Sequence, residues 1–524
     1  MEHIDDPHVL IPEILASHAA FHPRREAVVC GPVRRNWGEF GAGIDRVARA
    51  LQARGVGRGD KVAVLMGNSV EMLEIIFGIV RAGACVVPLS GLLTAAQLAT
   101  LLDDSESVLA FATGDFRDRI DPERGRLAGV LPGGWIAVFG DAPGWTGFDD
   151  FLAGGDAAAD PLPVCTSADA FNIIYSSGTT GLPKGIVQTH RARTHWAFSN
   201  AIEMGFTDRS RALTTTSLYS NGTWLMMLPV LFAGGTCVVM PSFDPAAFLE
   251  HVALERITHT FMVPSQYIAV LGSPALDGAD TSSLQVLLCA GSPLRREARR
   301  EVVRRFGNRL HELYGFSEGF ASMLKPHHDP EKSDTVGTPV LGFEVRILDD
   351  AGNALPRGET GEIAAYGAGM MKEYHRRPEQ TAELVWRDER GRSFIRSGDI
   401  GRLDADGFLV LLDRKKDMLI SGGFNVFPAD IEQVLAGHPA VLDVSVIGIP
   451  HEKWGETALA LVIPRPGAQA SESDIAAWAN ERLARHQRLA RVEFRDEFPR
   501  NALGKVLKRL LRAPYWGDGS PSAG

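Results

Sequence analysis

The stretch Tyr175-Ser176-Ser177-Gly178-Thr179-Thr180-Gly181-Leu182-Pro183-Lys184-Gly185 follows the apolar run FNIIY and precedes a predicted helix that begins near Thr189. It places four Ser or Thr hydroxyls, three glycines and one lysine within eleven residues. Glycine lets the backbone approach a ligand closely, and successive N–H groups form a concavity that binds anions. The spacing differs from the GxxxxGK[ST] pattern of a Walker A loop. The stretch therefore predicts a phosphate-binding loop of another kind, with Lys184 adding a positive charge.

This loop lies within a regular alternation of short apolar strands and amphipathic helices. Residues 61–66 (KVAVLM) predict a strand, residues 70–82 a helix and residues 85–89 another strand. The same rhythm recurs at residues 171–175, 235–240, 258–263 and 284–289. Strands separated by helices form mostly parallel sheets, so the sequence predicts a large layered α/β domain.

The pattern changes from about Asp334 onward. Residues 343–348, 361–366 and 407–412 predict closely spaced strands joined by turns, which is typical of a small antiparallel β subdomain. A charged junction then precedes a fresh α+β pattern. We expect a large N-terminal domain over residues 1–412, a small mobile α+β domain over residues 413–512 and a flexible tail over residues 513–524.

Composition excludes several classes of protein. The 54 Lys+Arg against 64 Asp+Glu give a net charge of −10, which argues against a nucleic-acid binder. The longest apolar stretch, residues 226–240, contains Pro229, Gly234 and Gly235 and is too short for a membrane span. The acidic N-terminus resembles no signal or transit peptide. Five scattered cysteines without a CxxC pair are typical of a reduced protein, so we predict a cytoplasmic location.

Further short motifs follow the loop, and each is ordinary when taken alone. They are Gly291-Ser292-Pro293, Tyr314-Gly315-Phe316-Ser317-Glu318, Ser397-Gly398-Asp399, Asp413-Arg414-Lys415-Lys416-Asp417, Gly422-Gly423 and Pro499-Arg500-Asn501-Ala502-Leu503-Gly504-Lys505. A tripeptide such as Ser-Gly-Asp is usually a turn, and a charge run is usually a solvated surface. Their order along the chain is what makes the set informative.

In that order, the motifs resemble those of the adenylate-forming superfamily, which includes acyl- and aryl-CoA synthetases, luciferases and the adenylation domains of peptide synthetases. The resemblance covers about residues 12–512. It implies an enzyme that activates a carboxylic acid with ATP and Mg²⁺ and then passes the acyl group to coenzyme A. Residues 1–412 would then be the AMP-binding domain, and the small C-terminal domain would swing about a hinge at Lys416.

The resemblance also implies a role for each matching residue. The nucleotide would contact Ser176, Ser177, Gly178, Thr179, Thr180, Gly181, Lys184, Gly291, Tyr314, Ser317, Asp399 and Arg414. Tyr314 would stack on adenine, and Glu318 would hold Mg²⁺. Asp399 would accept both ribose hydroxyls, since one carboxylate has two acceptor oxygens. Lys505, Glu318, Thr179 and Lys184 would be catalytic, and Gly422 and Gly423 would line the thiol tunnel.

The acid is less well defined than the nucleotide. The superfamily often has His where Ser220 stands in residues 217–222, and Ser317 replaces the usual Thr. We expect Ser220, Trp224 and Gly315 to contact the acid, and the neighbouring Tyr219, Met226, Met227 and Phe320 suggest an apolar one. Met226 and Met227 fit a core position at least as well. A fatty, an aromatic and a terpenoid acid all remain open.

Other functions remain alternatives. The chain could load a carrier protein supplied in trans, it could be a luciferase, or it could be a non-catalytic nucleotide-binding regulator. Retention of Lys505, Glu318 and Asp399 together argues against the last of these. The expected partners are a small carboxylic acid and CoA, without nucleic acid or a membrane span, and a homodimer is left open.

Overall fold

The structure is a computed structural model that describes residues 9–155, 161–176, 183–421, 424–500 and 506–516. The chain divides into two compact units. Unit 1 consists of Met1–His328, Pro339–Phe343 and Tyr366–Glu383, and unit 2 consists of Asp329–Thr338, Glu344–Ala365 and Leu384–Gly524. The domain boundary that the sequence places at residue 413 stays a prediction.

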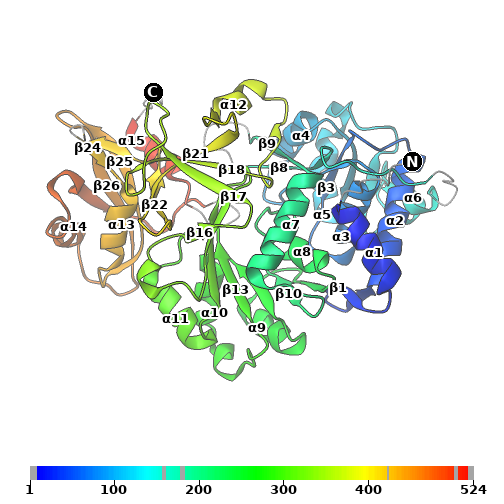
Figure 1. The fold of residues 1–524 in the computed structure, drawn as a ribbon, viewed down its shortest axis with the longest axis horizontal. Coiled ribbons are helices and arrows are strands. Elements are labelled where there is room, and N and C mark those ends of the chain that lie inside the picture. The colour runs from blue at the N-terminus through cyan, green and yellow to red at the C-terminus, as the bar shows by residue number, and fades with distance from the viewer. Residues whose placement is uncertain (1–8, 156–160, 177–182, 422–423, 501–505, 517–524) are drawn as a thin grey trace. The chain divides into compact units, whose positions relative to one another are not determined.

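The helices and strands of the described residues are labelled in Figure 1. The α-helices are α1 (Ile11–Phe21), α2 (Trp37–Ala53), α3 (Val70–Arg81), α4 (Ala95–Asp104), α5 (Gly114–Ile120), α6 (Phe148–Ala153), α7 (His190–Met204), α8 (Trp224–Phe232), α9 (Pro245–Leu254), α10 (Pro264–Leu271), α11 (Arg296–Phe306), α12 (Pro378–Glu383), α13 (Pro428–Ala436), α14 (Glu472–Asn480) and α15 (Lys508–Trp516). The strands are β1 (Glu26–Cys30), β2 (Val33–Asn36), β3 (Lys61–Leu65), β4 (Cys85–Pro88), β5 (Ser107–Ala112), β6 (Trp135–Ala137), β7 (Thr146–Gly147), β8 (Ala170–Tyr175), β9 (Gly185–Thr189), β10 (Arg211–Thr214), β11 (Thr236–Val239), β12 (His259–Met262), β13 (Val286–Ala290), β14 (Leu310–Gly315), β15 (Ala321–Leu324), β16 (Thr338–Pro339), β17 (Phe343–Leu348), β18 (Gly361–Gly367), β19 (Glu373–Tyr374), β20 (Val385–Arg387), β21 (Ser393–Leu403), β22 (Leu409–Arg414), β23 (Leu419–Ser421), β24 (Phe424–Val426), β25 (Val441–His451), β26 (Gly455–Pro464) and β27 (Leu489–Phe494).

The first sheet of unit 1 has the strand order β15-β14-β13-β12-β10-β11-β1-β2. Neighbours from β14 to β1 run parallel, and β15 and β2 are antiparallel to their neighbours. Helices α9, α10 and α11 cover one face of it, where side chains such as Phe248, Tyr267 and Phe306 pack against Leu213 and Leu287. This burial is the main source of stability for the layer.

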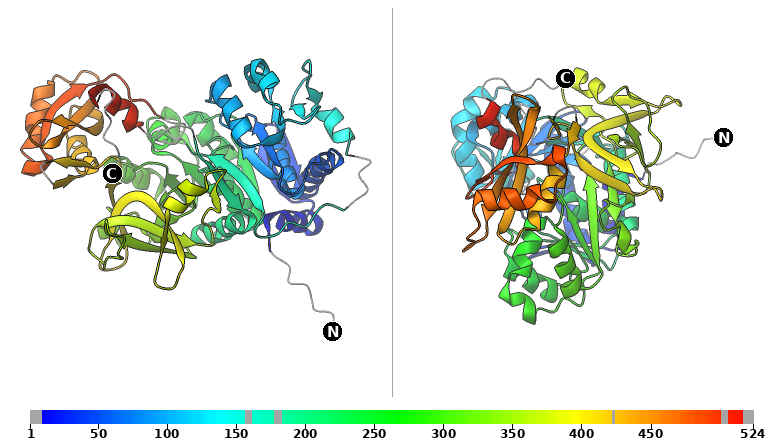
Figure 2. Two further views of the ribbon diagram at one scale, coloured as in Figure 1. Left: turned by 90° about the horizontal axis from the view of Figure 1, so that it is seen from above. Right: turned by 90° about the vertical axis from the view of Figure 1, so that its left-hand side faces the viewer.

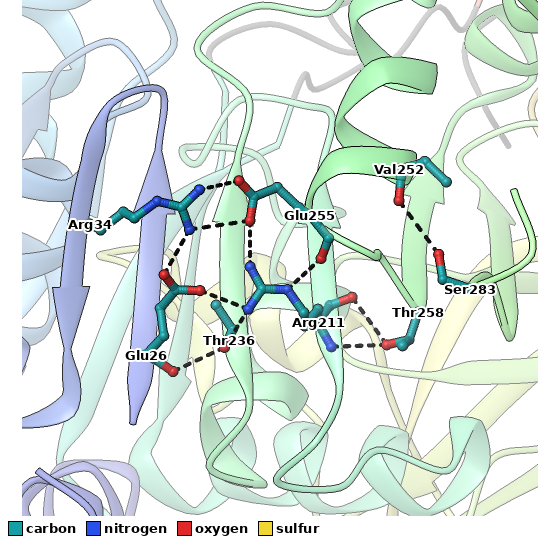
Figure 3. Close-up of polar contacts among 8 residues, drawn as sticks. All are labelled: Glu26, Arg34, Arg211, Thr236, Val252, Glu255, Thr258 and Ser283. Carbon is teal, nitrogen blue, oxygen red and sulfur yellow. Dashed lines mark hydrogen bonds and ion pairs between the residues drawn. The ribbon is translucent and has the colours of Figure 1, made fainter. Parts of the chain in front are cut away.

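A polar network links neighbouring strands at one end of this sheet (Figure 3). Arg211 of β10 donates to Glu26 of β1 at 2.7 Å and to Glu255 at 2.5 Å. Arg34 of β2 donates to the same two carboxylates, at 2.7 Å to Glu26. Because two guanidinium groups share two carboxylates, the network joins the adjacent strands β1 and β2 to β10 and to Glu255 at the end of α9.

The second sheet of unit 1 has the order β19-β9-β8-β4-β3-β5-β6-β7. Successive strands from β8 to β7 in this order run parallel, whereas β9 runs antiparallel to both β8 and β19. Helices α4 and α5 pack against it through Leu98, Leu102 and Phe116. The two sheets confirm the predicted layered α/β fold.

Helix α7 carries several side chains of the candidate site, and local signals fix both of its ends. Thr189 caps the helix by accepting a hydrogen bond from the backbone N–H of Ala192 at 3.2 Å. The helix ends at Gly205, whose φ of +68° is a left-handed conformation that glycine adopts without strain. The predicted start near Thr189 agrees with this cap.

Unit 2 contains two smaller sheets. One has the order β17-β18-β21-β20, with β22 paired to β21. The other has the order β24-β23-β26-β25, with β27 paired to β26. Along β25 and β26, Val446 and Ala460 pack in one buried cluster with residues of α13 and α14, whereas Ile447 and Leu459 pack in another with Leu511 of α15. Figure 2 draws this end of the chain in orange and red. This alternation follows from the period of two in a strand.

The end of the chain differs from the predicted tail. Helix α15 continues to Trp516, four residues beyond Arg512. The Trp516 indole donates to the Gly448 carbonyl at 2.9 Å, and the Tyr515 hydroxyl contacts Arg495 at 2.7 Å. These tertiary contacts order residues 513–516, which carry no periodic pattern that sequence analysis could detect.

Two further expectations can be compared with the described residues. All five cysteines are buried free thiols. Burial raises the pKa of Cys30 and of Cys165 to about 11, which makes both thiols poor nucleophiles at neutral pH. None of the helices built from the described residues has the length and apolar character that crossing a membrane requires.

Candidate nucleotide and acid site

Strands β8 and β9 hold the two ends of the predicted phosphate loop together. Tyr175 pairs with Gly185 across the antiparallel ladder, and the Ser176 N–H donates to the Lys184 carbonyl at 3.0 Å. A Cβ on Gly185 would lie 2.8 Å from Ile173, so this position has no room for a side chain. The loop itself, with Ser177, Gly178, Thr179, Thr180 and Gly181, lies outside the described residues.

The other nucleotide motifs of unit 1 lie at one edge of the first sheet. The parallel strands β10 and β13 are followed by residues 217–222 and Gly291, and β14 ends within residues 314–318. Ala290 pairs with Leu313, so Gly291 lies beside Tyr314. Ligands of open α/β sheets bind at the carboxyl ends of the strands, which is where these motifs meet. Gly291 has a φ of +94°, which favours glycine.

Close backbone packing fixes the turn that carries Glu318. A Cβ on Gly315 would lie 2.3 Å from the Phe320 carbonyl oxygen, and one on Gly319 would lie 2.3 Å from the Gly369 oxygen. The Glu318 carbonyl accepts a hydrogen bond from the Met371 N–H at 2.6 Å. The turn therefore cannot accept a side chain at either glycine without moving.

Two predicted motifs meet at Tyr374. Its hydroxyl donates to Glu318 Oε1 at 2.5 Å, and the Lys184 ammonium lies 4.8 Å from the centre of its ring. Strand β19 presents Tyr374 because it pairs with β9, the strand that begins directly after Lys184. Burial and the Glu318 carboxylate raise the pKa of Tyr374, so the hydroxyl keeps its proton and acts as a donor.

Sequence analysis did not select Tyr374. It stands in Met371-Lys372-Glu373-Tyr374, a segment without a glycine-rich or charged signature of its own. Its partner Glu318 is 56 residues away, so no local spacing connects the two. The tertiary structure brings them together, with the Met371 N–H bonded to the Glu318 carbonyl just before β19.

The carboxylate of Glu318 suits a magnesium ion as a ligand. Mg²⁺ is usually held by one or two carboxylates together with substrate phosphates and water, so it requires no cage of protein ligands. Among the described residues no group of three His, Cys, Asp or Glu side chains could hold a metal. Within that part of the chain, Glu318 Oε1 accepts from Tyr374 while Oε2 accepts no hydrogen bond. A single carboxylate with one available oxygen fits the predicted role.

The expected acid contacts differ in exposure. Ser220 is half-buried and Gly315 is exposed. Trp224 is only 2% exposed, and its indole donates to the Leu218 carbonyl at 2.8 Å. Met226 and Met227 are fully buried in α8. Both methionines therefore serve the core in the free protein.

The predicted ribose residues are neighbours within unit 2. Asp399 of β21 pairs with Arg414 of β22, and Arg414 Nε lies 3.6 Å from Asp399 Oδ1. The backbone N–H of Asp399 donates to Ser397 Oγ at 3.0 Å, and Ser397 Oγ donates to the Ile363 carbonyl at 2.8 Å. The Asp399 side chain is 11% exposed. The carboxylate therefore has a fixed backbone and a cationic neighbour.

The remaining predicted residues are only partly described. Lys416 is exposed, and its carbonyl accepts a hydrogen bond from Arg512 at 3.1 Å. Gly422, Gly423 and Lys505 lie outside the described residues.

The Tyr374 contact leads to a testable prediction. Tyr374→Phe removes the hydrogen bond to Glu318 but keeps the ring under Lys184. We expect the Mg²⁺ concentration at half-maximal rate to rise by about tenfold, as for other residues that orient a metal ligand. A Mg²⁺ titration of pyrophosphate release measures it.

Tyr175→Phe is the matched control for this prediction. The Tyr175 hydroxyl also donates to a carboxylate, that of Asp104 at 2.8 Å, without contacting Glu318. We expect its Mg²⁺ dependence to stay normal. A normal Mg²⁺ titration in Tyr374→Phe would show that Tyr374 does not orient Glu318.

Comparisons with known proteins identify the family of this chain. The AMP-binding enzyme family model matches residues 15–375, and the AMP-binding enzyme C-terminal domain matches residues 430–505. A feruloyl-CoA synthase of Amycolatopsis sp is 35% identical over 95% of this chain and 97% of its own length. An indoleacetate–CoA ligase of Aromatoleum aromaticum is 34% identical over 95% and 97%. ATP-bound MatB from Rhodopseudomonas palustris has a TM-score of 0.85 and 29% identity, covering 96% of this chain and 99% of that one. The chain therefore belongs to the AMP-binding enzyme family.

Proposed function

We propose that this protein is an acid–CoA ligase that adenylates an apolar aromatic carboxylic acid and transfers the acyl group to coenzyme A. The observation that carries the assignment is the cluster of Lys184, Tyr374 and Glu318, which joins the phosphate loop to the carboxylate proposed for Mg²⁺. The names of these two relatives, a feruloyl-CoA synthase and an indoleacetate–CoA ligase, support an aromatic acid.

The first half-reaction needs positive charge near the α-phosphate of ATP. A carboxylate oxygen of the acid attacks the α-phosphorus, a new phosphorus–oxygen bond forms and the bond to pyrophosphate breaks. Negative charge builds up beside an anionic nucleotide, so fixed cations and N–H donors lower the barrier. Lys184 and Lys505 are proposed to supply this charge. Mg²⁺ bound at Glu318 would neutralise phosphate oxygens.

The second half-reaction uses the same carbonyl carbon. The sulfur of CoA attacks it, the thioester bond forms and AMP leaves with the electron pair of the carbon–oxygen bond, while the thiol proton passes to solvent. Lys505 is needed only in the first step, so we propose that rotation about Lys416 exchanges it for the thiol tunnel at Gly422 and Gly423.

The nucleotide contacts are proposed as follows. The phosphates contact Ser176, Ser177, Gly178, Thr179, Thr180, Gly181 and Ser317; adenine contacts Gly291 and Tyr314; and the ribose contacts Asp399 and Arg414. The acid contacts Gly315, Ser220 and Trp224. Gly291, Tyr314 and residues 217–222, which precede Trp224, lie at the carboxyl ends of parallel strands in the first sheet. This placement supports one shared pocket in unit 1.

The substrate class is tested by a panel of acids in a pyrophosphate-exchange assay. Ferulate, indoleacetate and benzoate are compared with octanoate, palmitate and malonate. We expect the highest kcat/KM with an aromatic acid. Faster turnover with palmitate would assign a fatty acid instead. Acyl transfer to a phosphopantetheinylated carrier protein in preference to CoA would replace the proposed acceptor.

The thiol tunnel gives a prediction that separates the two half-reactions. Gly423→Leu places a side chain where backbone is proposed to line the pantetheine path. We expect most of the pyrophosphate-exchange rate to remain and thioester formation to be abolished. A melting curve identifies loss of folding, and normal acyl-CoA synthesis by a folded variant would refute the tunnel.

A further inference from the structure

Arg193 of α7 is a buried cation with an unusual set of partners. The residue is 3% exposed. Its Nε donates to Asn172 Oδ1 at 2.6 Å, and its Nη2 donates to Asn221 Oδ1 at 2.9 Å. Its Cζ lies 4.7 Å from the centre of the Trp224 ring. Two neutral amides and one aromatic face therefore surround the guanidinium.

No carboxylate among the described residues forms an ion pair with Arg193. Burial lowers the pKa of Arg193 to about 9, so the side chain still carries its charge at neutral pH. A buried charge without a counter-ion is costly, and an apolar residue of similar volume would often give a more stable core. Core stability alone is therefore a poor explanation for arginine at this position.

The bond to Asn221 joins the second half of residues 217–222 to α7, whereas the other hydrogen bonds of that half are local backbone bonds, including those from Thr223 N–H to Ser220 and from Leu225 N–H to Gly222 at 3.1 Å each. The first half of the segment is fixed by Asn68, which contacts the Thr216 carbonyl at 3.2 Å and the Leu218 N–H at 2.8 Å. In the second half, the Ser220 N–H donates to the Ser217 carbonyl at 2.9 Å. The Asn221 side chain bonds to Arg193.

The other partner of Arg193 lies on the strand of the phosphate loop. Asn172 is fully buried in β8, which ends at Tyr175 directly before Ser176. The guanidinium thus joins the strand that leads to the loop with the segment that carries Ser220. A planar group with donors at fixed angles can span both amides, which the single ammonium of a lysine cannot do.

We propose that Arg193 is a positioning residue for acid recognition, which fixes Asn221 and its neighbour Ser220 relative to strand β8. The inference rests on the proposed function, because it assigns residues 217–222 to the acid pocket. It adds a residue that contacts neither ATP nor the acid and acts through Asn221.

Three variants test this role by pyrophosphate exchange with the best acid of the wild-type protein. Arg193→Gln and Asn221→Ala each remove the bond between the two residues. Arg193→Lys keeps the positive charge but lacks the planar guanidinium that bonds both amides. We expect each to raise the KM for the acid by about tenfold, the loss typical of one hydrogen bond to a charged donor. The KM for ATP is expected to change by less than about twofold, because the bond holds the acid segment and not the nucleotide.

The double variant and a surface control separate positioning from general damage. Because both single changes break the same bond, Arg193→Gln with Asn221→Ala should raise the acid KM no further than either alone. Arg191→Gln changes an exposed arginine of the same helix and should behave as wild type. Asn221 is only half-buried, so Asn221→Ala decides the question if Arg193→Gln fails to fold.

Several results would overturn the proposal. An unchanged acid KM in Asn221→Ala would remove the positioning role, and so would an Arg193→Lys variant that matches wild type, since charge alone would then suffice. Equal increases in the KM for acid and for ATP would assign Arg193 to folding of the whole site. A wild-type protein that shows no pyrophosphate exchange with any acid would refute the proposed function itself. An active wild-type protein whose variants have the same KM for the acid would refute only the role of Arg193.

Discussion

Replacing Lys505 by alanine is expected to lower the rate of acyl-adenylate formation by about a hundred- to a thousandfold, the effect of removing one group that stabilises transition-state charge. The lysine would approach the α-phosphate only in the first half-reaction. Thioester formation from a supplied acyl-adenylate should therefore continue at close to the wild-type rate. Pyrophosphate exchange measures the first step, and CoA-dependent release of AMP from the synthetic adenylate measures the second.

A matched lysine in the same domain serves as the control for this prediction. Lys453 is exposed, and its ammonium lies 4.7 Å from the centre of the Trp454 ring. Lys453→Ala should leave both half-reactions unchanged. Equal loss of both half-reactions in Lys505→Ala would contradict the assigned role, because a lysine that acts on the α-phosphate has no part in thiol transfer.

The second large effect is expected from Asp399→Ala. A carboxylate that accepts both ribose hydroxyls makes two charge-assisted hydrogen bonds, and their loss should raise the KM for ATP by about a hundredfold. The KM for the acid should change little. Arg414, the cationic neighbour of Asp399, is 40% exposed, so the variant leaves no buried unpaired charge. Steady-state kinetics with varied ATP give the result.

Asp496→Ala is a suitable control for the ribose contact. Asp496 is an exposed aspartate of unit 2 that forms no hydrogen bond or ion pair with the described residues. We expect its KM for ATP to equal that of wild type. A normal KM for ATP in a folded Asp399→Ala variant would place the ribose contact elsewhere.

Much of the fold could be predicted because local sequence patterns determine it. The apolar run KVAVLM forms β3, and FNIIY forms most of β8, as expected from their β-branched residues. The start of α7 agrees with its Thr189 cap. The family could also be predicted, because the order of the glycine-rich and charged motifs is visible in the sequence alone.

The contacts that complete the site could not be predicted in the same way. The bond between Tyr374 and Glu318 depends on the tertiary contact of residues 371–374 with the turn that carries Glu318. The bond between Arg193 and Asn221 depends on how α7 packs beside α8. Both join residues that are far apart in sequence and carry no local motif. Tertiary packing also extends α15 to Trp516, where the sequence lacks helical periodicity.

The central claim is that one active site forms an acyl-adenylate and then a thioester. It is tested most directly by a single-turnover experiment, in which the protein is mixed with ATP, Mg²⁺ and an aromatic acid, quenched and analysed by mass spectrometry. We predict a stoichiometric acyl-adenylate with pyrophosphate before CoA is added, and its conversion to acyl-CoA and AMP afterwards. Formation of ADP and phosphate, or of acyl-CoA without a prior adenylate, would contradict the proposed function.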